Sequence, residues 1–293
     1  AQARAGARAN GGGGIILVCT AAKFEETRAL WIAETWSRRL PANWSLEFVS
    51  DPREASAGDG DGRALHGHAV ARLAPPPYWQ FPGPKGGYQS HLYKFFLGLR
   101  GALLEKPPRA WYGLVDDDSF VDAEELRSAL AAALGSGAPY CEPLCVGPDH
   151  QEGANDPFPE PDFTYAWMMR ECQEWSAARL RRPGSQLPGL HRSCMASVLG
   201  RLSWGPALDR MQVHGAGIFC TRAAAMRLLP HLEADMTRGL AGLFTPIFGS
   251  AMPPWDTVLN ACMEDLGIAK AALPFHGHFA PWSESFSKPG RNL

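Results

Sequence analysis

The chain lacks any apolar run of the roughly 20 residues needed to cross a bilayer. Its opening, AQARAGARANGGGG, has no apolar core like that of a signal peptide. We therefore expect a soluble chain. An excess of one charge is also missing, because 28 Lys and Arg face 30 Asp and Glu, for a net charge of −2. Such a balance would not gather nucleic acid or an anionic membrane, so neither is expected as a partner.

A tight metal-binding cysteine cluster is absent as well. The sequence has 7 cysteines, spread widely, and only Cys141 and Cys145 are close enough to suggest a local pair. That spacing lacks the second pair that a zinc site would need, so we predict disulfides with at least one thiol left over. NWS at Asn43 matches the N-glycosylation acceptor pattern. Together these features favour a secretory compartment.

What is present is enough apolar sequence for a large core. A chain of 293 residues with 45% hydrophobic content fits one large α/β domain or two small ones. Residues 1–14 are rich in Ala, Gly and Arg without periodicity, which is typical of a flexible tail or a stem remnant. The domain is expected to begin near Gly14, and we assign residues 15–293 to it.

Strands and helices are expected to alternate along the first half. Apolar runs and alternation predict strands at 15–18, 44–51 and 109–115, and helical spacing predicts helices at 24–36, 89–104 and 121–134. Residues 52–87 are too rich in Gly and Pro for a regular element, so we expect a long surface loop. This alternation predicts an α/β fold with a largely parallel central sheet.

The second half is interrupted by Pro, Gly, Cys and Trp. We expect a Gly-broken strand that runs into a helix over 213–232. From 253 to 279 we expect a helix, a turn at Gly267 and a short strand.

Three consecutive aspartates follow the strand WYGLV directly. In an extended segment Asp116 and Asp118 would share one face and Asp117 would take the other. Two carboxylates at the end of a strand are oxygen ligands for a divalent cation such as Mg²⁺ or Mn²⁺, and open α/β sheets bind ligands at those ends. The alternative is an acidic turn in which Asp118 or Ser119 caps the next helix.

Two later segments fit a metal and nucleotide site. His276 and His278 follow a short apolar run, and an imidazole can complete a site of carboxylates and phosphate oxygens, more naturally for Mn²⁺ than for Mg²⁺. Gly215 and Gly217 flank Ala216, which lets the backbone approach a ligand or adopt a positive φ. A hydrogen-bonded structural histidine and a simple bulge are the alternatives.

Taken in order, these segments resemble the Fringe-like and core 1 galactosyltransferase-like inverting β1,3-glycosyltransferases, family 31 of the glycosyltransferases. The resemblance runs from about Ile15 to Phe279 and is most specific in WYGLVDDDSFV, which looks like the family's aromatic, apolar, Asp-Asp-Asp, aromatic block. Upstream, TAAKFEETRALWIAETW is similar to the family's first strand and helix, and Lys94 lies where these enzymes carry a lysine. Downstream, HGAGIFCTR, PPWDTVL and FHGHF resemble the Gly-rich segment, the acidic segment and the Phe-His ending.

The resemblance implies a GT-A fold, with 15–138 as the nucleotide-sugar-binding half and 139–293 as the acceptor-binding half. It implies a UDP-sugar donor, a glycan or glycoprotein acceptor, and Mn²⁺ or Mg²⁺ as cofactor. It also implies the Golgi or ER lumen, through a type II membrane anchor outside this sequence, or secretion.

Residue by residue, the resemblance assigns metal binding to Asp118, Asp116 and His276, with His278 in reserve. Asp116 would also face the ribose or uracil, with Asp117 supporting it. Asp256 would be the general base. The remaining nucleotide-binding residues would be Thr20, Arg28, Lys94, Gly215 and Gly217.

The chain departs from the family at three places. Trp255 and Asp256 stand where members often have two acids, His214 replaces the first glycine of the Gly-rich segment, and 52–87 has no match. The function expected is metal-dependent transfer of a hexose or N-acetylhexosamine in a β1,3 linkage to a glycan or O-linked sugar. The alternatives are a non-catalytic glycan-binding or chaperone-like relative, and a Ca²⁺ or Mg²⁺ site that serves only stability.

Overall fold

The computed structural model describes residues 13–52, 64–74, 90–135, 137, 139–148, 217–232, 255, 259, 262–263 and 266–273. The strands in this part of the chain are β1 Gly14–Cys19, β2 Ser45–Ser50, β3 Ala64–Leu65, β4 His68–Arg72, β5 Trp111–Asp116, β6 Leu144–Pro148, β7 Ile218–Thr221 and β8 Ala269–Leu273. The helical elements are η1 Ala22–Phe24, η2 Glu25–Ala29, α2 Leu30–Glu34, η3 Trp36–Arg39, α3 His91–Leu104, α4 Ala123–Leu134, α7 Arg222–Leu228 and η7 Leu229–His231.

The strands form one 8-stranded sheet in the order β3-β4-β2-β1-β5-β7-β6-β8. Strands β4, β2, β1 and β5 run parallel to one another, and β8 runs parallel to β6. Strand β3 is antiparallel to β4, and β7 is antiparallel to both β5 and β6. The predicted α/β fold with a mostly parallel sheet is confirmed.

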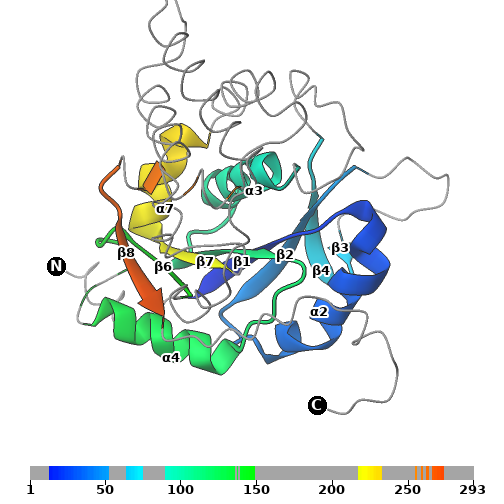
Figure 1. Cartoon of the computed structure of the whole chain (residues 1–293), viewed down its shortest axis with the longest axis horizontal. Coiled ribbons are helices and arrows are strands. Elements are labelled where there is room, and N and C mark those ends of the chain that lie inside the picture. Colours follow the sequence, from blue (N-terminus) through cyan, green and yellow to red (C-terminus); the bar gives the residue numbers. More distant parts are fainter. Residues whose placement is uncertain are drawn as a thin grey trace, which may run out of the picture.

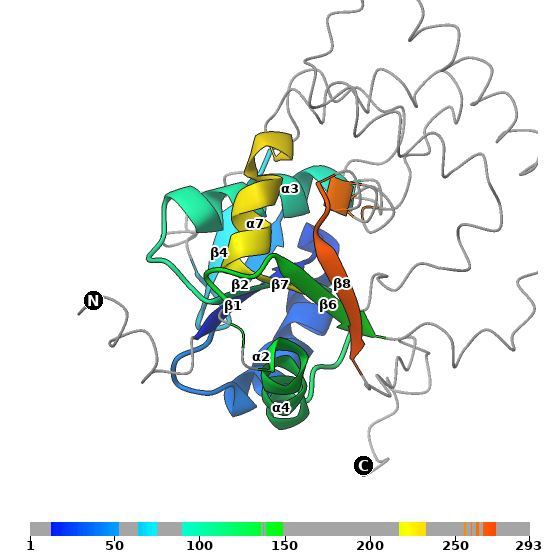
Figure 2. The ribbon, with the colours of Figure 1, turned by 90° about the vertical axis from the view of Figure 1, so that its left-hand side faces the viewer.

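Helices cover both faces of the sheet. Figures 1 and 2 show α3 and α7 on one face, with α2 and α4 on the other. Successive side chains of β1 alternate between two buried clusters: Leu17 packs in the cluster with α3 and α7, and Ile16 and Val18 pack in the one with Ile32 and Leu126. Because β1 is buried on both faces, it reads in sequence as a continuous apolar run. No helix in the described ranges is long and apolar enough to span a membrane.

The predicted helix at 24–36 is helical but not continuous. It divides into η1, the π-helical η2, α2 and η3. Thr35 ends α2 with φ −112° and ψ −102°, and its hydroxyl donates to the carbonyl of Trp31 at 2.6 Å. Such a side-chain bond to the preceding turn competes with regular helix geometry.

The prediction of one long loop over 52–87 is wrong for residues 64–72. There β3 and β4 form a hairpin whose turn residues, His66 and Gly67, have φ of 50° and 83°. Two consecutive positive φ values belong to the tightest hairpin turns, in which Asn-Gly is the usual pair. His-Gly is not a typical pair for this turn, and the many glycines nearby make the segment look like a loop, so the sequence did not indicate the hairpin.

The cysteine pairing also differs from the prediction. Cys145 of β6 forms a disulfide with Cys220 of β7, directly across the strand pair, and Cys141 is free and exposed. The local pairing of Cys141 with Cys145 is therefore wrong, whereas disulfides with a thiol left over are confirmed. The strand running into a helix is confirmed as β7 and α7, and the turn at Gly267 leads into β8.

Of the predicted tail at 1–14, residues 1–12 lie outside the described residues, and Gly14 is the first residue of β1. The division into a nucleotide-sugar-binding half and an acceptor-binding half stays a prediction.

Candidate functional site

The parallel strands β4, β2, β1 and β5 all end at one side of the sheet, which we call the carboxyl edge. Cys19, the last residue of β1, pairs with Val49 of β2 and with Asp116 of β5. Thr20, Asp51 and Asp117 therefore come together just beyond the strand ends. Ligands of open α/β sheets bind outside this kind of edge.

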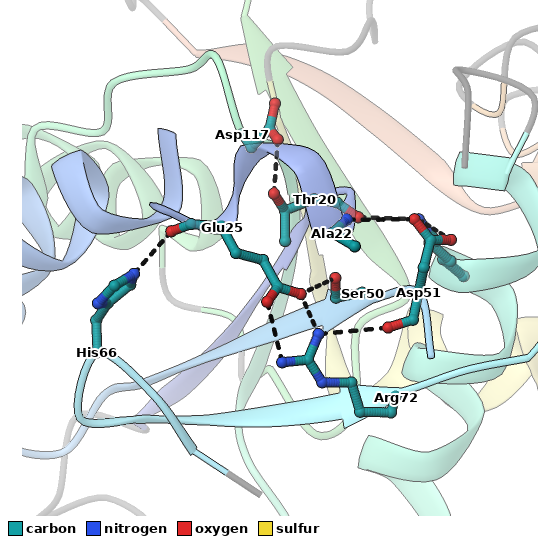
Figure 3. A network of polar contacts seen from close by, with 9 residues as sticks. Thr20, Ala22, Glu25, Ser50, Asp51, His66, Arg72 and Asp117 are labelled. Atoms are coloured by element: carbon teal, nitrogen blue, oxygen red, sulfur yellow. Dashed lines mark hydrogen bonds and ion pairs between the residues drawn. The ribbon is translucent and has the colours of Figure 1, made fainter. Parts of the chain in front are cut away.

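Asp117 is held by two of the predicted site residues. The hydroxyl of Thr20 donates to Oδ2 of Asp117 at 2.7 Å (Figure 3), and Nη1 of Arg28 donates to Oδ1 at 2.8 Å. Asp117 is 3% exposed and Thr20 is fully buried. Two donors from residues 20–28 thus reach a carboxylate that lies 97 and 89 positions further along the chain. Both are charge-assisted hydrogen bonds, which are stronger than neutral ones.

The predicted alternation of the aspartates does not hold. Strand β5 ends at Asp116, and a turn follows in which the amide of Ser119 donates to the carbonyl of Asp116 at 3.2 Å. Arg28 lies beside both Asp117 and Asp118, with 3.8 Å from Nη1 to Oδ2 of Asp118. Asp117 and Asp118 therefore both lie beside Arg28, because the extended backbone ends at Asp116.

Asp116 has partners from other elements. Nδ1 of His91, at the start of α3, donates to Oδ1 at 3.1 Å, and Nε1 of Trp255 lies 3.4 Å from Oδ2. The Trp255 ring packs against Phe95 of α3 with the centroids 4.3 Å apart. Nothing in the sequence marks His91 as a partner of Asp116, and Trp255 stands out only as a departure from the family pattern.

Asp118 is the most open member of the triplet, with 47% of its side chain exposed. Partial burial and the negative charges of Asp116 and Asp117 raise the pKa of this carboxyl above its ordinary value, and Arg28 offsets part of the effect. A cation at this carboxylate would relieve the same repulsion.

The helix-cap alternative for the triplet is wrong. Helix α4 is capped by Asp122, whose Oδ1 accepts from the amides of Glu124 at 3.0 Å and Glu125 at 2.9 Å. Neither Asp118 nor Ser119 is needed to begin this helix. The Ser119 hydroxyl is buried and makes no hydrogen bond to any described residue, and a buried hydroxyl usually has a partner.

Lys94 lies beneath the carboxyl edge. Its ammonium group is fully buried, donates to the carbonyl of Thr20 at 2.9 Å and pairs with Oδ1 of Asp51 at 2.7 Å. The helix that carries it approaches the sheet closely at Gly98, where a Cβ would come within 3.0 Å of Val49. Lys94 thus ties the ends of β1 and β2 together, and its contact with a nucleotide stays a prediction.

Gly217 precedes β7 at the same edge. Its φ of 140° disfavours any side chain, and a Cβ there would lie 3.3 Å from the Phe219 ring and 3.4 Å from Val115. The positive φ expected for this segment is confirmed at Gly217. A role in ligand approach stays a prediction.

Several predicted site residues lie outside the described part of the chain. They are Gly215, Asp256, His276 and His278. Their predicted roles therefore have no geometry behind them. Trp255, the sequence neighbour of Asp256, is described and touches the triplet.

The candidate site carries an excess of carboxylates, which are possible ligands for a divalent cation. Among the described residues of this contact network the carboxylates outnumber the permanent cations. The carboxylates are Glu25, Asp51, Asp116, Asp117 and Asp118, and the cations are Arg28, Arg72 and Lys94. Oxygen ligands with excess negative charge suit Mg²⁺ or Mn²⁺. Across the described ranges, however, no group of at least three His, Cys, Asp or Glu side chains is arranged to hold a metal.

No protein-family profile matches the chain, and no curated protein does. Among solved structures the chain is similar to the galactosyltransferase LgtC in complex with donor and acceptor sugar analogs, at 9% identity and a TM-score of 0.39, over 88% of this chain and 73% of that one. It is also similar to mouse xyloside xylosyltransferase 1 in its apo form, at 12% identity and a TM-score of 0.38, over 89% and 85% of the two chains. Likeness of this degree assigns no activity.

Proposed function

We propose that this protein is a GT-A type, metal-dependent inverting glycosyltransferase. It would transfer a hexose or N-acetylhexosamine from a UDP-sugar to a glycan or an O-linked sugar on a protein, in a β1,3 linkage. The observation that carries the proposal is the aspartate turn at the carboxyl edge. Thr20 and Arg28 fix Asp117 there, while Asp118 keeps an open carboxylate.

The nucleotide would lie across the ends of β1 and β5. Asp118 and Asp116, with His276 or His278, would hold Mn²⁺ or Mg²⁺, which supplies charge neutralisation for the departing diphosphate when bound. Arg28 is 22% exposed, so its remaining N–H donors are available to the uridine or phosphate side of the donor. Gly215 and Gly217 would let the backbone lie close to the donor.

Inversion needs a base on the face of the sugar opposite the leaving group, and it needs no protein nucleophile. We assign the base to Asp256, which would take the proton of the acceptor hydroxyl. The contact of Trp255 with Asp116 supports this role, because it brings the chain next to Asp256 up to the triplet. The Trp255 ring itself contacts both Phe95 and Asp116.

The direct test is UDP release from a set of UDP-sugars, with and without Mn²⁺. We expect release from at least one sugar, only with the metal, and a rise in melting temperature with UDP and Mn²⁺ together. If no sugar is turned over and UDP with Mn²⁺ does not stabilise the protein, the proposal is rejected.

A non-catalytic, glycan-binding or chaperone-like relative is the second candidate. It is favoured by the internal bonding of both Asp116 oxygens, to His91 and Trp255. Stabilisation by UDP or glycan without turnover of any UDP-sugar would identify it.

The Golgi or ER lumen, or secretion, is the compartment we propose. The disulfide between Cys145 and Cys220 supports it, because such bonds persist in oxidising compartments.

A further inference from the structure

We propose that Glu25 and Arg72 form a positioning pair that sets the reach of Arg28 to Asp117. Glu25 is fully buried, Arg72 is 19% exposed, and neither has been given a role in binding or catalysis above. Its consequence for nucleotide binding rests on the proposed function, whereas its effect on the Arg28–Asp117 contact can be tested without any ligand.

The carboxylate of Glu25 is fully buried and fully used. It accepts from the Ser50 hydroxyl at 2.5 Å, from Nη1 of Arg72, and from Nη2 of Arg72 at 3.1 Å (Figure 3). Burying a charge is costly even when it is paired, and apolar residues often stabilise such a position equally well. A fully buried Glu25 carboxylate at the carboxyl edge, bonded on both oxygens, therefore points to a geometric role.

The main chain of Glu25 is held as well. Nε2 of His66 donates to the Glu25 carbonyl at 2.7 Å, from the turn of the β3–β4 hairpin. Arg72 belongs to the same hairpin and also donates to the carbonyl of Asp51 at 3.3 Å. The hairpin thus fixes both the side chain and the backbone of Glu25 against the ends of β2 and β4.

Glu25 opens η2, and Arg28 lies in the last turn of that element. A π-helical turn is wider than an α-helical one and often marks a functional site. The guanidinium of Arg28 lies over the Phe24 ring at 4.1 Å and bonds to Asp117 at 2.8 Å. Residues 24–28 therefore act as one unit, in which Glu25 is fixed to the hairpin and Arg28 contacts Asp117.

Glu25 is 0% exposed, so it cannot touch a substrate and acts only through Arg28. A long Arg side chain loses rotamer freedom when it is ordered. Fixing the turn beneath it removes the remaining freedom of the backbone. Without the Glu25–Arg72 pair, Arg28 would keep its charge, but its guanidinium would no longer be held within hydrogen-bonding distance of Asp117.

The test is a double-mutant cycle between Arg28→Met and Asp117→Asn, measured by urea unfolding in wild-type and Arg72→Met backgrounds. We expect a favourable Arg28–Asp117 coupling in the wild type, its loss with Arg72→Met, and an intermediate value with Arg72→Lys, which keeps the charge but not the two-pronged contact. An unchanged coupling in every Arg72 variant that folds would overturn the inference. Arg72→Lys keeps the test decisive even when Arg72→Met does not fold.

Glu47→Gln is the matched control. Glu47 lies on β2, the strand that also provides Ser50, and it forms an ion pair with Lys106. It should lower stability and leave the Arg28–Asp117 coupling intact. With UDP and Mn²⁺, Arg72→Met should weaken binding by roughly tenfold or more, as expected when a charge-assisted hydrogen bond from Arg28 is misplaced. A wild type that binds no UDP would reject the proposed function, while the cycle would still decide the role of Arg72.

Discussion

Each aspartate of the triplet has a different environment. Asp116 is bonded to His91 and Trp255, Asp117 is bonded to Thr20 and Arg28, and Asp118 faces solvent beside Arg28. Each of the three like charges therefore has protein partners. Partial burial and the charges of Asp116 and Asp117 raise the pKa of Asp118.

Asp118→Asn should stabilise the protein in the absence of ligand at neutral pH. A carboxyl whose pKa is raised on folding contributes stability that is present when it is protonated and lost as the pH rises through that pKa. The variant removes this loss, so its gain in melting temperature should shrink as the pH falls towards 3.8, the ordinary value. Thermal unfolding between neutral and acid pH checks this. A lower melting temperature than wild type at pH 7 would contradict it.

Asp256→Asn should separate binding from transfer. The variant keeps the size of the side chain but cannot take a proton, so transfer should fall by about 10²-fold or more, in line with the usual contribution of a general base. Binding of UDP with Mn²⁺ should stay within about twofold of wild type, a difference below 0.5 kcal/mol. Wild-type turnover by the variant would remove Asp256 from the role of base.

The residue types at the site could be predicted from sequence, but their contacts could not. The run Asp116–Asp118 after a buried strand predicted an acidic site at a strand end, where it is found. Partners of Asp116 come from residues 91 and 255, far from it in sequence, and no local pattern encodes such distances. The alternation argument failed because it assumed that the strand continued through Asp118.

At the scale of elements, strong periodicity gave reliable predictions and mixed signals did not. Strand β1 and helix α3 were predicted within about two residues of their ends, because apolar spacing alone defines them. The β3–β4 hairpin was missed because it depends on two positive φ values at His66 and Gly67. The break at Thr35 goes with the bond of its hydroxyl to the Trp31 carbonyl, which apolar spacing does not reveal.

The hairpin should confer a pH dependence on stability through His68. Burial, reinforced by the nearby His66, lowers the pKa of His68 below its ordinary value of 6.5. Folding disfavours the protonated form of a histidine whose pKa it lowers. The contribution of His68 to stability is therefore fully present above its ordinary pKa and is lost as the pH falls below that value towards the lowered pKa. We expect His68→Gln to reduce the fall in unfolding free energy between pH 7.5 and about pH 5.

Urea unfolding at a series of pH values measures this difference. The centroids of the His68 and Phe48 rings are 6.0 Å apart, and Nε2 of His68 lies 3.1 Å from the Ser37 hydroxyl. The control is Ser37→Ala, which removes the hydroxyl contact but keeps the histidine that titrates. An identical pH profile for wild type and His68→Gln would contradict the assignment.

At the scale of the whole molecule, the sheet has two differently secured sides. On one side of β1 and β5, the hairpin is joined to the carboxyl edge by the Glu25–Arg72 pair. On the other side, strands β6 and β7 are joined by the disulfide Cys145–Cys220. The pairing of cysteines 75 positions apart follows from the strand order and could not be predicted from cysteine spacing.

Loss of that disulfide should lower stability without weakening nucleotide binding. The bond closes a long loop, and such bonds typically contribute about 2–4 kcal/mol. The double variant Cys145→Ser and Cys220→Ser should therefore melt at a lower temperature, whereas Cys141→Ser, at the exposed free thiol, should melt like wild type. Equal melting temperatures for all three proteins would contradict a stabilising role for the bond.

The central claim is that the carboxyl edge binds a nucleotide diphosphate through a divalent cation at Asp118. The measurement is the melting temperature of wild type and Asp118→Ala with UDP alone, Mn²⁺ alone, and both together. At about 100 times the dissociation constant, ligand binding adds about 2.7 kcal/mol, which raises the melting temperature by several degrees. The proposed function predicts that rise for the wild type only when both ligands are present, and none for Asp118→Ala. An equal rise in both proteins, or none in the wild type, would contradict it.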